Sequence, residues 1–163
     1  MTPIIMVVTG EHAWTLQALH LAAAMARETG ASLLLVEPVR VSHLEYLGAG
    51  LRETLLPYER LVALSEYSAA ICDYGIEVAV APYEYTDYAG GLVSAVEQIA
   101  PLAVFAPAPG GRLPLLAAAR LWLLRRALGR PLYTLGAGDG AATWTPAAPV
   151  ETPAAMASAI HHL

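Results

Sequence analysis

Hydrophobic residues recur along the first 135 positions in two alternating patterns. Short, unbroken apolar runs predict strands that are buried on both faces of a sheet. Longer stretches, in which apolar residues return every three or four positions, predict helices. The expected strands are 3–8, 32–36, 76–81, 102–106 and 131–135, and the expected helices are 12–29, 57–75, 87–100 and 113–128. This alternation predicts an α/β sandwich around a five-stranded parallel sheet.

Between and after these elements the periodicity is lost. Residues 37–56 follow neither pattern and are expected to be irregular. Beyond position 135, Gly, Ala, Pro and Thr dominate, as is typical of a surface segment without a core. We therefore predict an α/β domain over residues 1–135 and a C-terminal extension over residues 136–163, with room for a short terminal helix at 152–162.

The expected inner face of the helix at 57–75 follows from its apolar spacing. Leu61, Leu64, Ser68 and Ile71 recur at intervals of three and four and should face the sheet. Gly30 after the first helix predicts a C-terminal cap. Asp87 before the third helix predicts an N-cap.

Composition and charge exclude several classes of function. The net charge of -5 argues against general binding of nucleic acid. The chain has no lysine, which excludes a P-loop lysine and a Schiff-base lysine, and its single cysteine excludes a disulfide within the chain. No apolar run reaches the roughly 20 residues that span a bilayer. The first basic residue is Arg27, too late for a signal peptide, so we expect a cytoplasmic protein without a membrane partner.

The charges are nevertheless unevenly placed. Residues 1–111 carry four arginines and twelve acidic residues, whereas residues 112–130 carry five arginines and no acidic residue. This basic block is the expected anion-attracting region.

The candidate ligand site lies at two turns. In open parallel sheets, ligands bind at the carboxyl ends of the strands where the strand order reverses. That rule selects residues 9–12 after the first strand and 107–112 after the fourth. Gly110, Gly111 and Arg112 could bind an anion at the start of the fourth helix, the alternative being a plain turn into that helix.

Three further groups of residues invite a functional interpretation. Tyr83, Tyr85 and Tyr88 could stack on a planar ring, although a dimer contact or a cover over the second helix explains them more simply. Gly90-Gly91 in a first helical turn indicates close backbone packing or, alternatively, the approach of a ligand. His12 and His20 share a helix face, but no acidic residue completes a metal site.

At this point the chain resembles the universal stress protein family over roughly residues 3–135. The opening block 4–12, followed by an Ala-rich helix and the strand at 32–36, is similar to the start of that family. The blocks 75–78 and 86–88, the strand at 102–106 and the segment 129–132 follow in the order typical of it.

The resemblance implies a Rossmann-like sheet of order 3-2-1-4-5 and homodimers that pair through the strand near Pro131–Leu135. It also implies a split between ATP binders and non-binders. The binders carry Asp at the end of the first strand, where this chain has Thr9. They also carry a G-x-x-G motif with a later G-S or G-T after the fourth strand. Here Gly110 and Gly111 are adjacent, and Pro107 and Pro109 have no N–H group to offer a phosphate.

We therefore expect a universal-stress-protein-like, non-catalytic binding or signalling module of the stress response that lacks standard ATP binding. The alternative is a protein that binds ATP, another nucleotide or an anionic small molecule through a rearranged loop after the fourth strand. No cofactor is required, and ATP is the candidate if one binds. The candidate ligand-binding residues are Thr9, Gly10, Val36, Gly110, Gly111 and Arg112.

Overall fold

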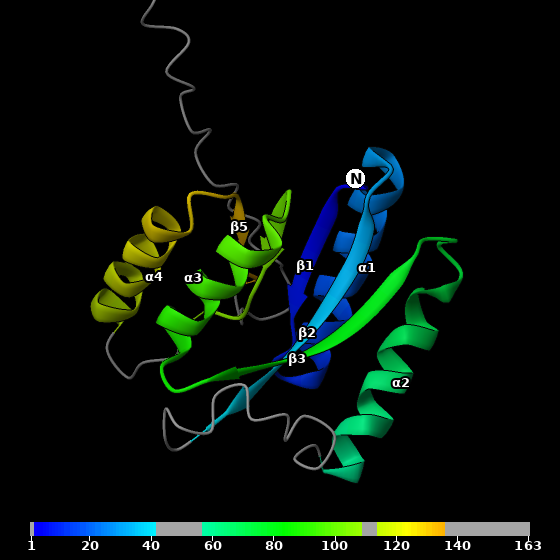
Figure 1. The fold of residues 1–163 in the computed structure, drawn as a ribbon, viewed down its shortest axis with the longest axis horizontal. Helices are drawn as coiled ribbons and strands as arrows, with labels where there is room; N and C mark the ends of the chain where they lie inside the picture. The colour runs from blue at the N-terminus through cyan, green and yellow to red at the C-terminus, as the bar shows by residue number, and fades with distance from the viewer. Residues whose placement is uncertain (1, 42–56, 109–113, 136–163) are drawn as a thin grey trace, which may run out of the picture.

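A five-stranded parallel sheet forms the centre of the molecule (Figure 1). The computed structural model describes residues 2–41, 57–108 and 114–135, without the side chains of residues 114 and 115. The strands are β1 (Ile4–Val8), β2 (Ser32–Arg40), β3 (Val78–Tyr85), β4 (Ala103–Phe105) and β5 (Leu132–Tyr133). Their order is β3-β2-β1-β4-β5, and all four pairings are parallel. Both the predicted fold class and the predicted strand order are confirmed.

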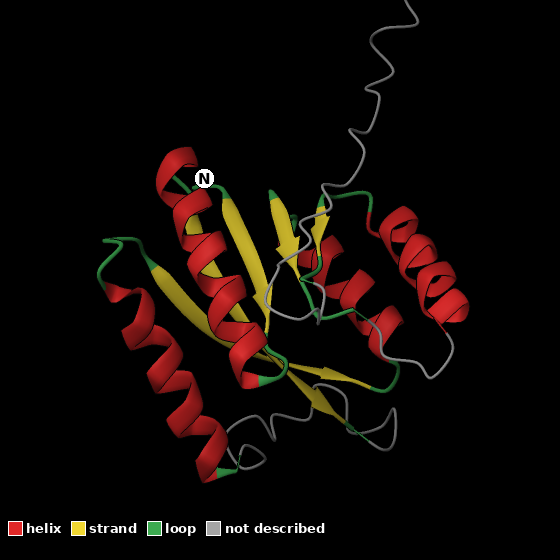
Figure 2. Cartoon of the chain, turned by 180° about the vertical axis from the view of Figure 1, so that it is seen from behind, coloured by secondary structure: helices red, strands yellow, loops and turns green. Residues whose placement is uncertain are grey.

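In the described part of the chain, four helices cover the two faces of this sheet. They are α1 (His12–Thr29), α2 (Tyr58–Cys72), α3 (Tyr88–Ile99) and α4 (Pro114–Leu128). The pair α1 and α2 covers one face and the pair α3 and α4 the other, as Figures 1 and 2 show from opposite sides.

Alternation along β1 explains why the sheet needs helices on both sides. Ile5 and Val7 lie in the core beneath α1 and α2, whereas Met6 and Val8 lie in the core beneath α3 and α4. All four side chains are almost completely buried. The unbroken apolar run in the sequence is therefore the signature of a central strand with two buried faces.

The helix ends follow the expected capping chemistry. Gly30 adopts a left-handed conformation, with φ of 65°, at the C-terminal end of α1. The Asp87 carboxylate accepts a hydrogen bond of 2.8 Å from the Gly90 N–H at the start of α3. Both caps are confirmed.

The expectation that residues 37–56 are irregular is wrong for its first four residues. Strand β2 continues to Arg40, and β3 continues to Tyr85, because the segment after Val36 pairs with β3 from Glu37↔Pro82 to Arg40↔Tyr85. Strand β1 pairs with β2 only as far as Val36, so this extension has a neighbour on one side alone. A proline without an N–H group is tolerated at such an edge.

The predicted inner face of α2 is partly wrong. Leu64 and Ile71 are buried as expected, but Leu61 is 50% exposed, and Tyr67 takes its place in the core. The Tyr67 hydroxyl lies 3.2 Å from Nδ1 of His12 on α1. This polar contact lets a tyrosine serve as a core residue, since its ring is buried while its hydroxyl keeps a partner.

Candidate functional site

Three of the predicted site residues meet at the carboxyl end of β1, beside the point where its pairing with β2 ends. The register of these strands pairs Val8 with Val36, which brings Thr9 beside the end of the β1–β2 pairing. The Thr9 N–H donates a hydrogen bond of 2.9 Å to the Val36 carbonyl. Gly10 follows directly and leads into α1. The structure thus brings Thr9, Gly10 and Val36 together.

A buried acidic residue that the sequence interpretation missed completes this edge. Glu37 is only 2% exposed, and its carboxylate accepts a hydrogen bond from the Thr9 hydroxyl. The other carboxylate oxygen lies 3.2 Å from Nε of Arg60 in the first turn of α2. We call these three residues the Thr9–Glu37–Arg60 triad. A glutamate placed directly after the apolar run at 32–36 was the signal that could have revealed it.

The triad explains how a carboxylate can be buried here. An unpaired buried charge is strongly unfavourable, whereas one with a cation and a hydroxyl donor is tolerated. Arg60 keeps 44% of its side chain exposed, so the pair lies between the core and the solvent. The polar groups at the end of the β1–β2 pairing therefore bind one another rather than facing an open site.

The N-terminus of α1 is occupied in the same way. The Gly10 N–H donates to the Thr15 hydroxyl at 2.9 Å. The Glu11 carboxylate accepts from the N–H groups of Ala13 and Trp14, each at 3.1 Å. These two hydrogen bonds hold the pKa of Glu11 below its usual value. A phosphate at this helix end would have to displace a carboxylate of the same charge.

The turns after β1 and β4 come into contact, as the fold rule predicts. A Cβ atom on Gly10 would lie 3.1 Å from Cγ of Pro107, a tight contact that would require the proline ring to shift by a few tenths of an ångström. The Trp14 indole N–H donates to the Leu135 carbonyl at 3.3 Å, which ties α1 to the end of β5. The remaining predicted site residues, Gly110, Gly111 and Arg112, lie outside the described residues.

The tyrosines near β3 pack on one another. Tyr85 and Tyr88 make an edge-to-face contact with ring centroids 5.9 Å apart. The cavity that they line together with Tyr83 and Val36 has a volume of about 10 Å³, which leaves no room for a planar ring. Tyr83 packs against the core beneath α3 and α4, on the opposite face from α2. The expectation that these tyrosines cover the second helix is therefore wrong.

Gly91 has a packing explanation. A Cβ atom on Gly91 would lie 2.6 Å from Cβ of Tyr85, too close for any larger residue without a shift of the backbone. Close backbone packing, the simpler of the two interpretations, accounts for this glycine.

The histidines of α1 pair with tyrosines. Nδ1 of His20 lies 3.1 Å from the Tyr74 hydroxyl, much as His12 pairs with Tyr67. Within residues 2–41, 57–108 and 114–135, no three His, Cys, Asp or Glu side chains form a group that could hold a metal ion.

Comparison with known proteins identifies the fold. No family model matches the sequence, and no curated protein matches it. Solved structures do match. A protein of the universal stress protein family from Burkholderia pseudomallei is 24% identical, with a TM-score of 0.57 over 82% of this chain and 96% of that chain. A universal stress protein in complex with cAMP is 14% identical, with a TM-score of 0.61 over 83% of this chain and 98% of that one. The chain has the universal stress protein fold.

The universal stress protein fold extends over nearly the whole length of these neighbours. A universal stress protein from Archaeoglobus fulgidus in complex with dAMP also matches, at 14% identity and a TM-score of 0.51 over 83% of this chain and 98% of that chain. The resemblance predicted from the sequence motifs is thus confirmed at the level of the fold. None of the helices in the described part of this universal stress protein fold is long and apolar enough to cross a membrane.

Proposed function

We propose that this chain is a universal stress protein that works as a non-catalytic binding or signalling module of the stress response and lacks standard ATP binding. The observation that supports this proposal is the Thr9–Glu37–Arg60 triad. We further propose that the protein is cytoplasmic and forms homodimers through the strand at 131–135. The segment 136–163 is, in this proposal, an extension outside the α/β domain.

The contacts within the triad leave no free side chain for the adenine contact that the resemblance implies. The resemblance implies that an aspartate at the end of β1 faces adenine in the ATP binders, and Thr9 stands at this position. The Thr9 hydroxyl is already a donor to Glu37, and Glu37 is paired with Arg60. A ligand that used either side chain would have to break contacts between buried groups, at a cost of about 1–3 kcal/mol for each group left unsatisfied.

The start of α1 adds a second argument. The N–H groups of Ala13 and Trp14 are bound to the Glu11 carboxylate, whose negative charge repels a phosphate. Pro107 after β4 offers no N–H group to a ligand. Together these features favour a site without the usual phosphate contacts.

The alternative function is binding of a nucleotide or another anionic small molecule through a rearranged loop after β4. Gly10 and Pro107 bring the turn after β1 and the beginning of the turn after β4 close together. In this alternative Gly110, Gly111 and Arg112 would supply the anion contacts. Two structural neighbours were solved in complex with cAMP and dAMP. In this alternative the ligand would also contact Thr9, Gly10 and Val36.

One experiment separates the two proposals. One sample of the purified protein is denatured, and the supernatant is analysed for released nucleotide. A second, native sample is titrated with Mg-ATP, cAMP and dAMP by calorimetry. We expect no released nucleotide and no heat of binding for Mg-ATP. Micromolar binding of Mg-ATP would contradict the leading proposal.

The same titration tests the alternative at the level of single residues. If a nucleotide binds, Arg112→Ala should weaken it about tenfold, which corresponds to one charge-assisted hydrogen bond. Arg130→Ala is the matched control, because it removes an equal charge from the same basic block outside the turn. If both variants bind the nucleotide with equal affinity, Arg112 does not contact it.

A further inference from the structure

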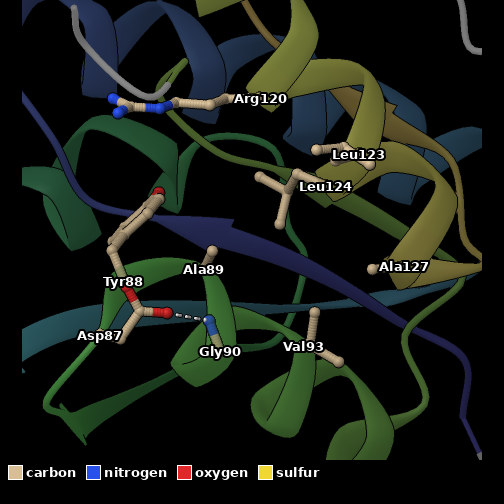
Figure 3. Close-up of a pocket in the computed structure, with 9 residues that line it drawn as sticks. All are labelled: Asp87, Tyr88, Ala89, Gly90, Val93, Arg120, Leu123, Leu124 and Ala127. Atoms are coloured by element: carbon tan, nitrogen blue, oxygen red, sulfur yellow. Dashed lines mark hydrogen bonds between the residues drawn. The ribbon is translucent and has the colours of Figure 1, made fainter.

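A cleft of about 750 Å³ lies between α3 and α4 (Figure 3), and no residue of the triad lines it. Its apolar wall is formed mainly by Val93 of α3 together with Leu123, Leu124 and Ala127 of α4. Its polar groups are contributed chiefly by Tyr88 and Arg120. Thr9, Gly10 and Val36 do not line it. Ligand sites typically enclose about 300–1,000 Å³ and combine apolar walls with a few convergent polar groups.

The Tyr88 hydroxyl is an unsatisfied donor. Its oxygen is buried and has no hydrogen-bond partner among the described residues. Buried hydroxyl groups nearly always have a partner, so an exception calls for a bound group or water. Burial raises the pKa of Tyr88 to about 12, with a smaller contribution from Tyr85. The hydroxyl is therefore protonated at neutral pH and requires an acceptor.

The charge of the cleft favours an anion. Arg120 is exposed and makes no ion pair within the described part of the chain. Among the described residues of the lining, Asp87 is the one acidic residue, and its carboxylate already accepts a hydrogen bond from the Gly90 N–H. Figure 3 shows the Tyr88 hydroxyl pointing to the side of the cleft where Arg120 lies, away from the Asp87 carboxylate. The donor and the positive charge thus lie on the same side.

The apolar wall indicates what the rest of the ligand should be. Leu123 lines the cleft and is 58% exposed, whereas Leu124, its neighbour in the chain and in the lining, is buried. Large apolar side chains next to a cavity are covered favourably by an apolar ligand, because this removes their surface from water. A highly charged nucleotide would leave this wall uncovered.

We propose that the cleft between α3 and α4 binds a small amphipathic anion. The apolar body of the ligand lies against Val93, Leu123 and Leu124. Its carboxylate accepts a hydrogen bond from the Tyr88 hydroxyl and faces the Arg120 guanidinium. None of the described residues of the site in the proposed function lines this cleft, so each proposal can fail without the other.

The test uses the full chain and three probes that differ in one property each. Decanoate carries an alkyl body and a carboxylate, decanol carries the same body without charge, and 2-naphthoate carries a carboxylate on an aromatic body. Binding is measured by calorimetry below the concentration at which decanoate forms micelles. We expect decanoate or 2-naphthoate to bind at least tenfold more tightly than decanol, and the tighter of the two identifies the body that the wall accepts. Equal binding of decanoate and decanol, or no binding of either carboxylate, would overturn the proposal.

Two variants test whether Arg120 and Tyr88 contact the carboxylate of the ligand. Arg120→Gln should weaken binding of the carboxylate about three- to tenfold, as expected for a partly exposed charge, and leave decanol unchanged. Tyr88→Phe removes only the hydroxyl and should weaken the carboxylate severalfold. Arg126→Gln is the control on the same helix, because Arg126 lies over the Trp122 ring, 5.6 Å from its centroid, and does not line the cleft. Equal losses in Arg120→Gln and Arg126→Gln would contradict the assignment.

Two other occupants are distinguished by the same samples. If a second copy of the chain covers the cleft, Arg120→Gln changes the scattering mass and decanoate does not bind, which overturns the proposal. If Mg-ATP displaces decanoate, the two sites overlap and the placement between α3 and α4 is wrong. Binding of decanoate at unchanged mass and in the presence of Mg-ATP supports it.

Discussion

The Thr9 hydroxyl donates a hydrogen bond to the buried Glu37 carboxylate, across the end of the parallel pairing of β1 with β2. The two residues are 28 positions apart in the chain, and only the strand register brings them together. Arg60 completes the contact from α2, so one carboxylate links β1, β2 and a helix on one face of the sheet. Thr9, which stands where a ligand-binding residue is implied by the resemblance, therefore stabilises the fold through this hydrogen bond.

Removal of Arg60 should destabilise the protein by leaving the Glu37 carboxylate buried without its cation. We expect Arg60→Gln to lower the free energy of unfolding by about 1–2 kcal/mol, less than for a fully buried pair because Arg60 is half exposed. Urea unfolding at neutral pH measures the change.

The double variant Arg60→Gln/Glu37→Gln tests whether the loss comes from the unpaired charge. A neutral glutamine at position 37 keeps an acceptor for Thr9 and no longer needs a cation, so we expect part of the stability to return. Glu66→Gln, on the exposed side of α2, is the control and should change stability by less than about 0.5 kcal/mol. Strict additivity of the two changes in the triad would show that Glu37 and Arg60 are not coupled.

Adjacent glycines at the start of α3 should respond differently to alanine. Gly91→Ala would place a Cβ atom 2.6 Å from Cβ of Tyr85, and we expect a loss of about 1–3 kcal/mol through overpacking. Gly90→Ala meets only the Asp87 carboxylate oxygen, at 3.2 Å, and gains helix propensity, so its effect should be much smaller. Thermal unfolding of the two variants makes the comparison, and equal losses would contradict the role of Tyr85.

The sequence was sufficient for the features that depend on local pattern. The run at β1, the periodicity of α1 and the caps at Gly30 and Asp87 were all predicted and are confirmed, since each reflects burial or hydrogen bonding within a few residues. The strand order was predicted only through the resemblance to a known family.

The features that depend on distant contacts were missed. The extension of β2 beyond Val36 contains Pro38, and the part of β3 that pairs with it contains Pro82. Prolines usually interrupt a strand, and only the absence of a neighbour on one side makes them acceptable here. Glu37 was missed as a site residue for a related reason, because its partners Thr9 and Arg60 come from other elements.

The buried Tyr88 hydroxyl should make the protein sensitive to alkaline pH. Burial raises the pKa of Tyr88 to about 12 in the folded state, against about 10 in the unfolded chain. The neutral phenol is thus favoured by folding, so its contribution is complete below pH of about 10 and is lost as the pH rises toward 12. The loss is on the order of 2 kcal/mol.

Tyr88→Phe isolates this effect. At neutral pH the variant should be as stable as the wild type or slightly more stable, because it removes a hydroxyl without a partner among the described residues. Above pH of about 10 it should retain more of its stability than the wild type does. Urea unfolding across the alkaline range measures the difference, and parallel pH profiles for the two proteins would show that Tyr88 ionises as freely when folded as when unfolded.

The outer edge of β5 should determine whether the proposed homodimer forms. The Pro131 and Tyr133 carbonyls accept hydrogen bonds from Val104 and Ala106, so these residues direct their backbone toward β4. Residues Leu132 and Thr134, which alternate with them, present their backbone groups to the opposite edge. A second copy that pairs through this strand would need those groups.

Thr134→Pro removes an outward N–H group and should shift the scattering mass from dimer to monomer, whereas Thr134→Val keeps that group and should leave a dimer. A wild-type protein that is monomeric at tens of micromolar, or a dimer that survives Thr134→Pro, would exclude pairing through β5.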